Sequence, residues 1–200
     1  MSNSHMINQW RIETGAPSLK GDANDIYMLI EPELWPNWKV QLYQEVREPF
    51  YRHLFDKTPF AHIEQGPILV AVSQQSLFHR AIENLQTSPC GCLLYVKKDA
   101  HPDTLLRILR ERLIAMRGSS TALLRYYEPR TLTPLLGTMS NEERSCFFQH
   151  IEQVYWYQER WHFITIEAIA SPPKHYQWII TPEHISTMQS ILQAQSGAVS

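Results

Sequence analysis

The chain has 200 residues, of which 44% are hydrophobic, and this is enough for one domain with a substantial apolar core. Its 18 basic and 20 acidic residues nearly cancel, and no long run of Lys or Arg occurs, which argues against a nucleic-acid partner. No segment approaches the ~20 apolar residues of a membrane-spanning helix. The three cysteines lack the spacing of a disulfide framework, and the first residues do not resemble a signal peptide. We therefore expect a cytoplasmic protein without membrane insertion.

The first half of the chain contains several short, uninterrupted apolar runs. Residues 1–6 resemble a cloning remnant, and we exclude them from the prediction of the fold. Residues 26–30 (IYMLI), 68–72 (ILVAV) and 92–96 (CLLYV) are apolar throughout. Such runs are typical of strands that are covered on both faces, as in the centre of a parallel sheet.

Segments between and after these runs have the apolar spacing of helices. The spacing predicts a helix over 42–54 that is bent or interrupted at Pro49, and an amphipathic helix over 76–86. A longer helix is predicted to begin at Pro102 and to end at Arg117-Gly118. Its charged residues are expected to face outward: Arg107, Arg110, Glu111 and Arg112.

The segment ALLRYY, residues 122–127, predicts a further strand, followed by helices over 130–139 and 140–151. Ser140 and Glu143 have the spacing of a capping box at the start of the second helix. Strands and helices thus alternate along the chain. This order predicts an α/β fold with a mainly parallel central sheet and flanking helices.

The C-terminal quarter is aromatic and β-branched, which predicts a hairpin of two antiparallel strands after residue 151. Residues 176–180 (YQWII) are a possible further strand, and Thr181-Pro182 predicts the start of a final helix. We therefore predict an α/β lobe over 7–151 and a smaller C-terminal lobe of hairpin plus helix over 152–200, packed on the first. One continuous domain is the alternative.

Motifs for catalysis or cofactor binding do not occur in the sequence. No histidine pair has zinc-ligand spacing, Cys90 and Cys92 form CxC, and neither a nucleotide-binding glycine loop nor a GxSxG elbow is present. We expect no metal, no cofactor and no enzymatic activity. Two alternatives stay open, namely a hydrolase that uses His162 and Glu167, and a carbohydrate-binding module built on the aromatic residues of 155–163.

The segment RYYEPR, residues 125–130, gathers charged side chains around a proline. Pro129 keeps Glu128 extended and suits the first position of a helix, so Glu128 falls at the N-cap. Its side chain is one methylene too long for a good cap, but it gains from the helix dipole and can pair with Arg125 or Arg130. From the residues alone, this cluster is either a structural ion pair or a contact for a partner.

The segment RYYEPR also resembles a known signature. Together with the apolar helix after it, the acidic helix with Glu142 and Glu143, and the aromatic strand with Trp156, it is similar to the R-x-Y-D-P-R signature of the type VI secretion effector adaptor chaperones. Glu128 stands where the signature has Asp. The resemblance implies a bacterial cytosolic chaperone, active in interbacterial competition and virulence, that binds a toxic effector and helps to load it onto a spike (VgrG-type) protein.

On this basis we predict a partner-binding groove between the two lobes. The effector, commonly through its N-terminal region, would contact Tyr126 and Trp156 as apolar anchors. Arg125 and Arg130 would orient carbonyl or carboxylate groups of the effector, and Glu128 completes the predicted set of partner-binding residues.

Overall fold

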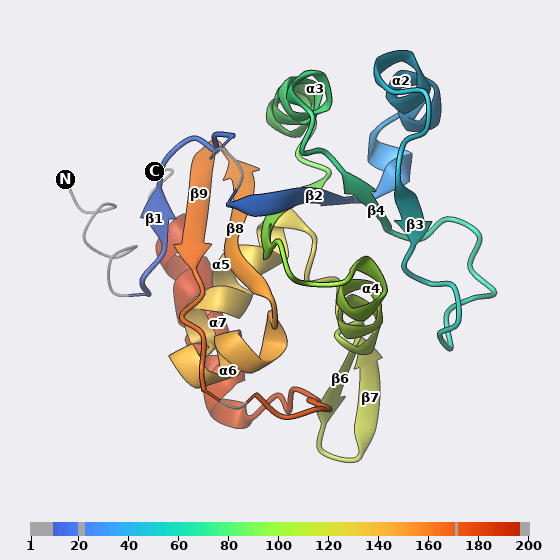
Figure 1. The fold of residues 1–200 in the computed structure, drawn as a ribbon. Helices are drawn as coiled ribbons and strands as arrows, with labels where there is room; N and C mark the ends of the chain where they lie inside the picture. The colour runs from blue at the N-terminus through green and yellow to red at the C-terminus, as the bar shows by residue number, and fades with distance from the viewer. Residues whose placement is uncertain (1–9, 20–22, 171, 197–200) are drawn as a thin grey trace.

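The computed structural model describes residues 10–19, 23–170 and 172–196, so the predicted cloning remnant lies outside the described residues (Figure 1). A seven-stranded sheet with the strand order β1-β9-β8-β5-β2-β4-β3 forms its centre. A separate hairpin contains two more strands. The strands are β1 (Glu13–Thr14), β2 (Asn24–Ile30), β3 (Tyr51–His53), β4 (Ile68–Ala71), β5 (Gly91–Lys97), β6 (Ile114–Arg117), β7 (Ser120–Leu123), β8 (Ile151–Gln158) and β9 (Arg160–Thr165).

Every strand pair of the large sheet is antiparallel, so the prediction of a mainly parallel sheet is wrong. The apolar runs of β2, β4 and β5 do form central strands that are covered on both faces, as expected. Burial on two faces, however, specifies only the surroundings of a strand and not its direction. The helical segments between β2 and β3 and between β4 and β5 do join strands that run in the same direction, but the two strands of each pair are not adjacent. One antiparallel strand lies between them, β4 in the first pair and β2 in the second.

Alternate residues of the central strands enter two core clusters, one on each face of the sheet. Tyr27 and Leu29 of β2 belong to the first cluster. Met28 and Ile30 belong to the second. The first face carries helices α4 (Pro102–Glu111), α5 (Pro129–Thr138) and α6 (Asn141–Phe147), and the second carries α2 (Trp38–Glu45) and α3 (Gln75–Thr87). Helix α7 (Pro182–Ser196) packs on α5, and a short 3-10 helix, η1 (Pro32–Leu34), follows β2.

Several predicted helices are shorter in the structure. Helix α2 ends at Glu45, and the chain after Pro49 forms β3 instead of a continued helix. Helix α4 ends at Glu111, so the apolar Met116 lies in β6. The capping box at the start of α6 is confirmed, because Ser140 and Glu143 exchange both of its hydrogen bonds.

The predicted hairpin after residue 151 is confirmed as β8 and β9, which are paired along their length. Strand β8 also pairs with β5, so the hairpin extends the central sheet instead of forming the sheet of a smaller lobe. The segment 176–180 contributes only one parallel bridge, between Ile179 and Met116 of β6. Helix α7 begins at Pro182, as predicted.

Candidate partner-binding site at the RYYEPR junction

The RYYEPR junction connects β7 to α5. The strand ends at Leu123, and residues 126–128 form a turn in which the Glu128 amide donates to the Arg125 carbonyl at 3.1 Å. The strand predicted over 122–127 therefore stops early, and its residues do not alternate between two faces. Tyr126 and Tyr127 are instead both buried, each with 1% of its surface exposed.

Three charged side chains of the junction meet a fourth from the end of β2. Glu128 is the N-cap of α5 and makes no capping hydrogen bond, as its side-chain length predicts. Its Oε1 instead accepts from Nε of Arg130 at 2.9 Å, and its Oε2 lies 3.9 Å from Nε of Arg125. Nη2 of Arg125 also donates to Oε2 of Glu31 at 3.0 Å. Arg125 thus joins two carboxylates that come from distant parts of the chain.

Partial burial perturbs the ionisation of this cluster. Burial raises the pKa of Glu31, although the neighbouring Arg125 opposes the shift. Burial, reinforced by the charge of Glu31, raises the pKa of Tyr127 to about 12. Burial alone would lower the pKa of Arg125, but Tyr127, Glu128 and Glu31 raise it. The guanidinium of Arg125 lies 5.9 Å from the centre of the Tyr127 ring, so a fixed cation rests on a neutral phenol.

A cavity of about 310 Å³ lies beside the cluster. Its polar rim includes Arg125 and Arg130, whose side chains are 47% and 83% exposed. The other walls come from the end of β2, the start of β5 and the β8–β9 turn, and include Leu34, Pro89, Cys90, Pro129 and Tyr157. Guanidinium donors over a mainly apolar wall suit a polypeptide that presents carbonyl or carboxylate oxygens.

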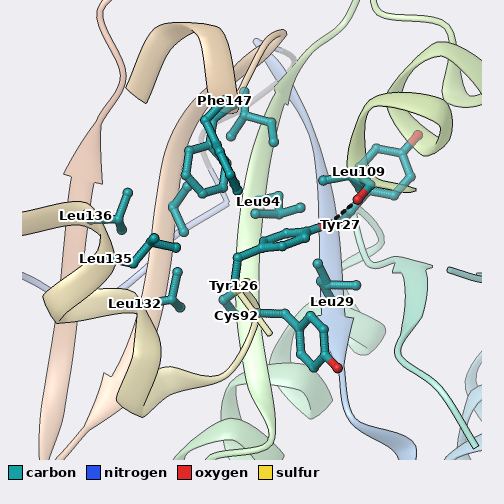
Figure 2. Packing of buried hydrophobic residues seen from close by; sticks show 14 of the residues in the cluster. Tyr27, Leu29, Cys92, Leu94, Leu109, Tyr126, Leu132, Leu135, Leu136 and Phe147 are labelled. Atoms are coloured by element: carbon teal, nitrogen blue, oxygen red, sulfur yellow. Dashed lines mark hydrogen bonds between the residues drawn. The ribbon is translucent and has the colours of Figure 1, made fainter. Parts of the chain in front are cut away.

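The two predicted apolar anchors lie in the core. The Tyr126 hydroxyl donates to the Leu109 carbonyl at 2.8 Å, and its ring packs on Phe147 (Figure 2). Trp156 has no exposed surface, and its Nε1 donates to Oγ1 of Thr133 at 3.1 Å. Of the five predicted contact residues, the structure brings Arg125, Glu128 and Arg130 together at the surface and keeps Tyr126 and Trp156 beneath it.

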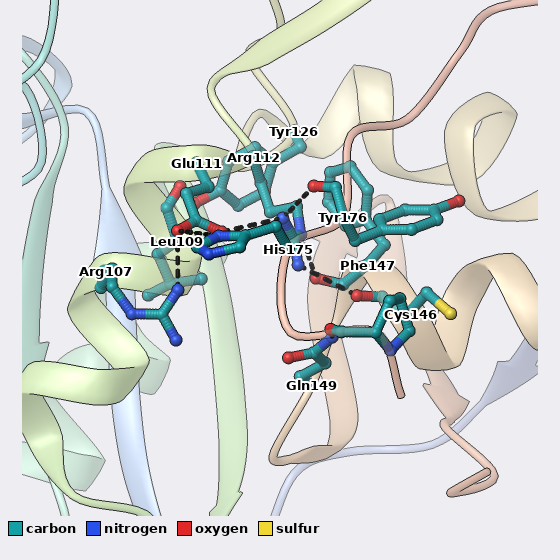
Figure 3. Close-up of polar contacts among 11 residues, drawn as sticks. Arg107, Leu109, Glu111, Arg112, Tyr126, Cys146, Phe147, Gln149, His175 and Tyr176 are labelled. Carbon is teal, nitrogen blue, oxygen red and sulfur yellow. Dashed lines mark hydrogen bonds and ion pairs between the residues drawn. The ribbon is translucent and has the colours of Figure 1, made fainter. Parts of the chain in front are cut away.

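Arg112 was expected to face solvent, and this expectation is wrong. The residue is 2% exposed because α4 ends one residue earlier and the chain turns inward. Its guanidinium donates to the carbonyls of Phe147 at 2.9 Å, Cys146 at 3.1 Å and Tyr176 at 2.5 Å (Figure 3). Arg112 therefore ties α4 to the end of α6 and to the segment before α7. Its spacing in the sequence matches that of an exposed helical arginine, so the pattern held no signal for burial.

Most residues of the two alternative hypotheses are buried or are bonded within the chain. His162 is 7% exposed and stacks on Trp156, and burial lowers its pKa. Its Nε2 lies 3.3 Å from the Gln158 carbonyl, whereas Glu167 accepts from Asn141. Tyr155, Trp156 and Trp161 are buried, so most of the aromatic segment fills the core. Within the described part of the chain, no group of three or more His, Cys, Asp or Glu side chains is arranged to hold a metal ion.

Comparison with known proteins identifies the family. The chain matches no curated protein and no solved structure. Among the described residues, no helix has both the length and the apolar character needed to cross a bilayer. The family model described as Domain of unknown function (DUF4123) matches residues 26–146, which run from β2 to α6 and include the RYYEPR junction. This match covers more than half of the chain, which therefore belongs to the DUF4123 family, a family associated with type VI secretion effector adaptors.

Proposed function

We propose that this protein is a cytosolic adaptor chaperone that binds a type VI secretion effector and promotes its loading onto a spike protein. The observation that carries the proposal is the RYYEPR junction, which lies inside the matched region and presents Arg125 and Arg130 beside an apolar cavity.

The arginine pair is suited to hold a polypeptide with moderate affinity. Arg130 is 83% exposed, so its contacts with an effector remain partly solvated and contribute little each. Arg125 is more enclosed, and Glu31 and Glu128 hold its guanidinium in place before a partner arrives. A preorganised donor loses less conformational entropy on binding. Moderate affinity fits an adaptor that must later release its effector to the spike.

The carboxylates also limit what the site can bind. Glu31 and Glu128 already neutralise much of the charge of Arg125 and Arg130. A strongly anionic ligand such as a polyphosphate therefore finds no excess of positive charge there. Backbone carbonyls of an effector need only the free guanidinium N–H groups, and the apolar wall accepts neighbouring side chains.

Co-expression with the effector encoded beside this chain tests the proposal. We expect a stoichiometric complex in size-exclusion chromatography with light scattering, and an effector that is insoluble or degraded when expressed alone. An effector that is equally soluble without this protein and never co-elutes would refute the chaperone role.

An Arg130→Ala variant tests the site itself. Because Arg130 is exposed and its partner Glu128 keeps Arg125 as a neighbour, the variant should fold normally. Loss of this largely solvated contact should weaken the complex by about two- to fivefold. Arg107→Ala is the matched control, since Arg107 is also an exposed helical arginine paired with a glutamate, but lies on α4 outside the cavity. Equal binding by the two variants would move the effector site elsewhere.

A further inference from the structure

The hairpin of β6 and β7 has one covered edge and one open edge. On the β6 side, the Met116 amide donates to the Trp178 carbonyl at 3.1 Å, and the Met116 carbonyl accepts from the Ile180 amide at 2.8 Å. The segment before α7 therefore covers β6. Strand β7 forms the other edge, and all four of its residues are exposed. Figure 1 shows this hairpin below α4, apart from the large sheet.

The register identifies the free backbone groups of β7. The Leu124 amide donates to the Leu113 carbonyl at 2.7 Å, which makes these two residues a hydrogen-bonded pair. Pairs in an antiparallel ladder alternate between bonded and non-bonded, so Ala122 is bonded to β6 whereas Thr121 and Leu123 are not. Their N–H and C=O groups point away from β6. Among the residues that the structure describes, these four groups have no hydrogen-bond partner.

The equivalent edge of the large sheet is protected. On β3, the carbonyls that point away from β4 belong to Tyr51 and His53. The first accepts from Nη1 of Arg52 and the second from Nη2 of Arg110, each at 2.8 Å. Arginine side chains thus cap the β3 edge, which is a known way to prevent strand addition. The β7 edge has no such cap, and at the opposite end of the large sheet β1 has only two residues.

The side chains around the open edge carry almost no charge, and those on one face of the hairpin are mainly apolar. Arg117 is the only charged residue of 114–123. Strand alternation and the bridge from Ile179 place four apolar side chains on the outward face of the hairpin. Two of them are large and well exposed, Leu123 at 37% and Ile179 at 60%. These four residues form an apolar strip beside the open edge: Ile114, Met116, Leu123 and Ile179.

We propose that the β7 edge binds an extended segment of the effector as an added β-strand. This inference rests on the proposed function and names the form in which the effector is held. The strand would exchange backbone hydrogen bonds with Thr121 and Leu123 and lay apolar or β-branched side chains on the strip. An acidic residue of the added strand could pair with Arg117, the only charged residue of the hairpin.

An effector segment fits this edge better than a second copy of the chain. The edge is four residues long, and pairing of two copies along it buries far less than the roughly 1,200–2,000 Å² of a stable protein interface. An effector segment has no such limit, because it can continue past β7. Leu123 lies two residues before Arg125, so the same segment can extend toward the cavity at the RYYEPR junction.

Residue-resolved amide exchange tests the proposal on the complete protein, with and without the co-expressed effector. In the free protein, Thr121 and Leu123 amides should exchange rapidly, whereas the Ala122 amide, which is bonded to β6, should be protected. In the complex, Thr121 and Leu123 should become protected at least tenfold. Protection confined to other surfaces would overturn the proposal even if the complex forms. Failure of the complex to form at all would refute the adaptor function first, and this inference with it.

Two substitutions provide a binding test. Thr121→Pro removes an outward N–H without removing a bond to β6, and should weaken effector binding about five- to tenfold. Leu123→Asp places a charge on the apolar strip and should also weaken binding. Its matched control is Ala122→Asp, which introduces the same charge at the neighbouring exposed position on the opposite face. Thermal unfolding verifies that each variant is folded.

The outcomes show whether an effector strand or a second copy of the chain pairs with the β7 edge. Weaker binding by Thr121→Pro and Leu123→Asp, with normal binding by Ala122→Asp, supports the effector strand. Unchanged binding by the first two variants, in a wild type that does bind, overturns it while leaving the adaptor function intact. A wild-type protein that is dimeric alone, and monomeric as Thr121→Pro, would assign the edge to a second copy and overturn the proposal.

Discussion

Replacement of Arg112 by alanine should destabilise the protein strongly. The buried guanidinium donates three hydrogen bonds to carbonyls of Cys146, Phe147 and Tyr176, and each bond from a charged donor contributes about 1.5–3 kcal/mol. Part of this gain offsets the cost of burying the charge, a cost that also lowers the pKa of Arg112. Removal of the guanidinium leaves three carbonyls without a donor, each at a cost of about 1–3 kcal/mol where it is buried, so we expect a loss of about 3–5 kcal/mol.

The assay is urea unfolding of the wild type and Arg112→Ala, with thermal unfolding as a second measurement. For a chain of this size, the expected loss corresponds to a melting temperature lower by about 6–20 °C. Arg107→Ala is the control, because Arg107 and Glu111 form a solvent-exposed i,i+4 pair worth about 0.3–0.5 kcal/mol. Arg112→Met separates the contribution of packing from that of hydrogen bonding, because methionine fills the space but leaves the three carbonyls without donors. We expect this variant to be destabilised as well.

A loss below about 1 kcal/mol for Arg112→Ala would refute this reasoning. It would mean that water enters and satisfies the three carbonyls, or that the contacts between α4 and α6 are not maintained in solution. Equal stability of Arg112→Met and the wild type would show that packing, and not hydrogen bonding, is the contribution of this side chain.

Two further predictions concern stability. Burial alone would raise the pKa of Glu143, but hydrogen bonds from Ser140 and Trp178 lower it below its ordinary value of 4.5. The resulting stabilisation is present above pH 4.5 and is lost as the pH falls through the folded-state pKa of Glu143. When unfolding is followed across pH, Glu143→Gln should therefore lose less stability in acid than the wild type does. At Gly91 a Cβ would overlap the Leu29 carbonyl oxygen and lie 2.8 Å from Cα of Ile30. Gly91→Ala should therefore lower the free energy of unfolding by about 3 kcal/mol in denaturant unfolding. Gly118 has open space around it and a left-handed φ of 60°, so Gly118→Ala should lower it by only about 1 kcal/mol. Equal losses would contradict the close approach of β5 to β2.

Sequence patterns identified most elements of the fold but not the direction of the strands. The runs in β2, β4 and β5, the amphipathic α3 and the capping box of α6 depend on local spacing, which the sequence displays directly. Strand direction depends on which segments pair, and β2 pairs with β4 and β5 instead of with its neighbour in an alternating βα order. Antiparallel strands covered by helices on both faces have the same apolar pattern as parallel ones.

The sequence predicted the ion pairs within the RYYEPR junction, but it did not predict which other residues surround them. The pairing of Glu128 with Arg125 and Arg130 followed from short spacing around Pro129. Glu31 lies 94 residues from Arg125, so only the folded sheet brings the two together. Tyr126 and Trp156 looked like binding aromatics because residue type alone does not distinguish a core ring from an exposed one.

The order of strands in the sheet has a consequence for synthesis of the protein. Central strand β5 pairs on one side with β2, which precedes it, and on the other with β8, where Cys92 lies opposite Trp156. While the chain emerges from the ribosome, one edge of β5 remains unpaired until residues up to about 158 are available. A fragment limited to the matched region, 26–146, would keep that edge open permanently, together with the apolar side chains beside it. The nascent protein must therefore avoid aggregation until its last quarter has been translated, and a stop codon after α6 should give an insoluble product.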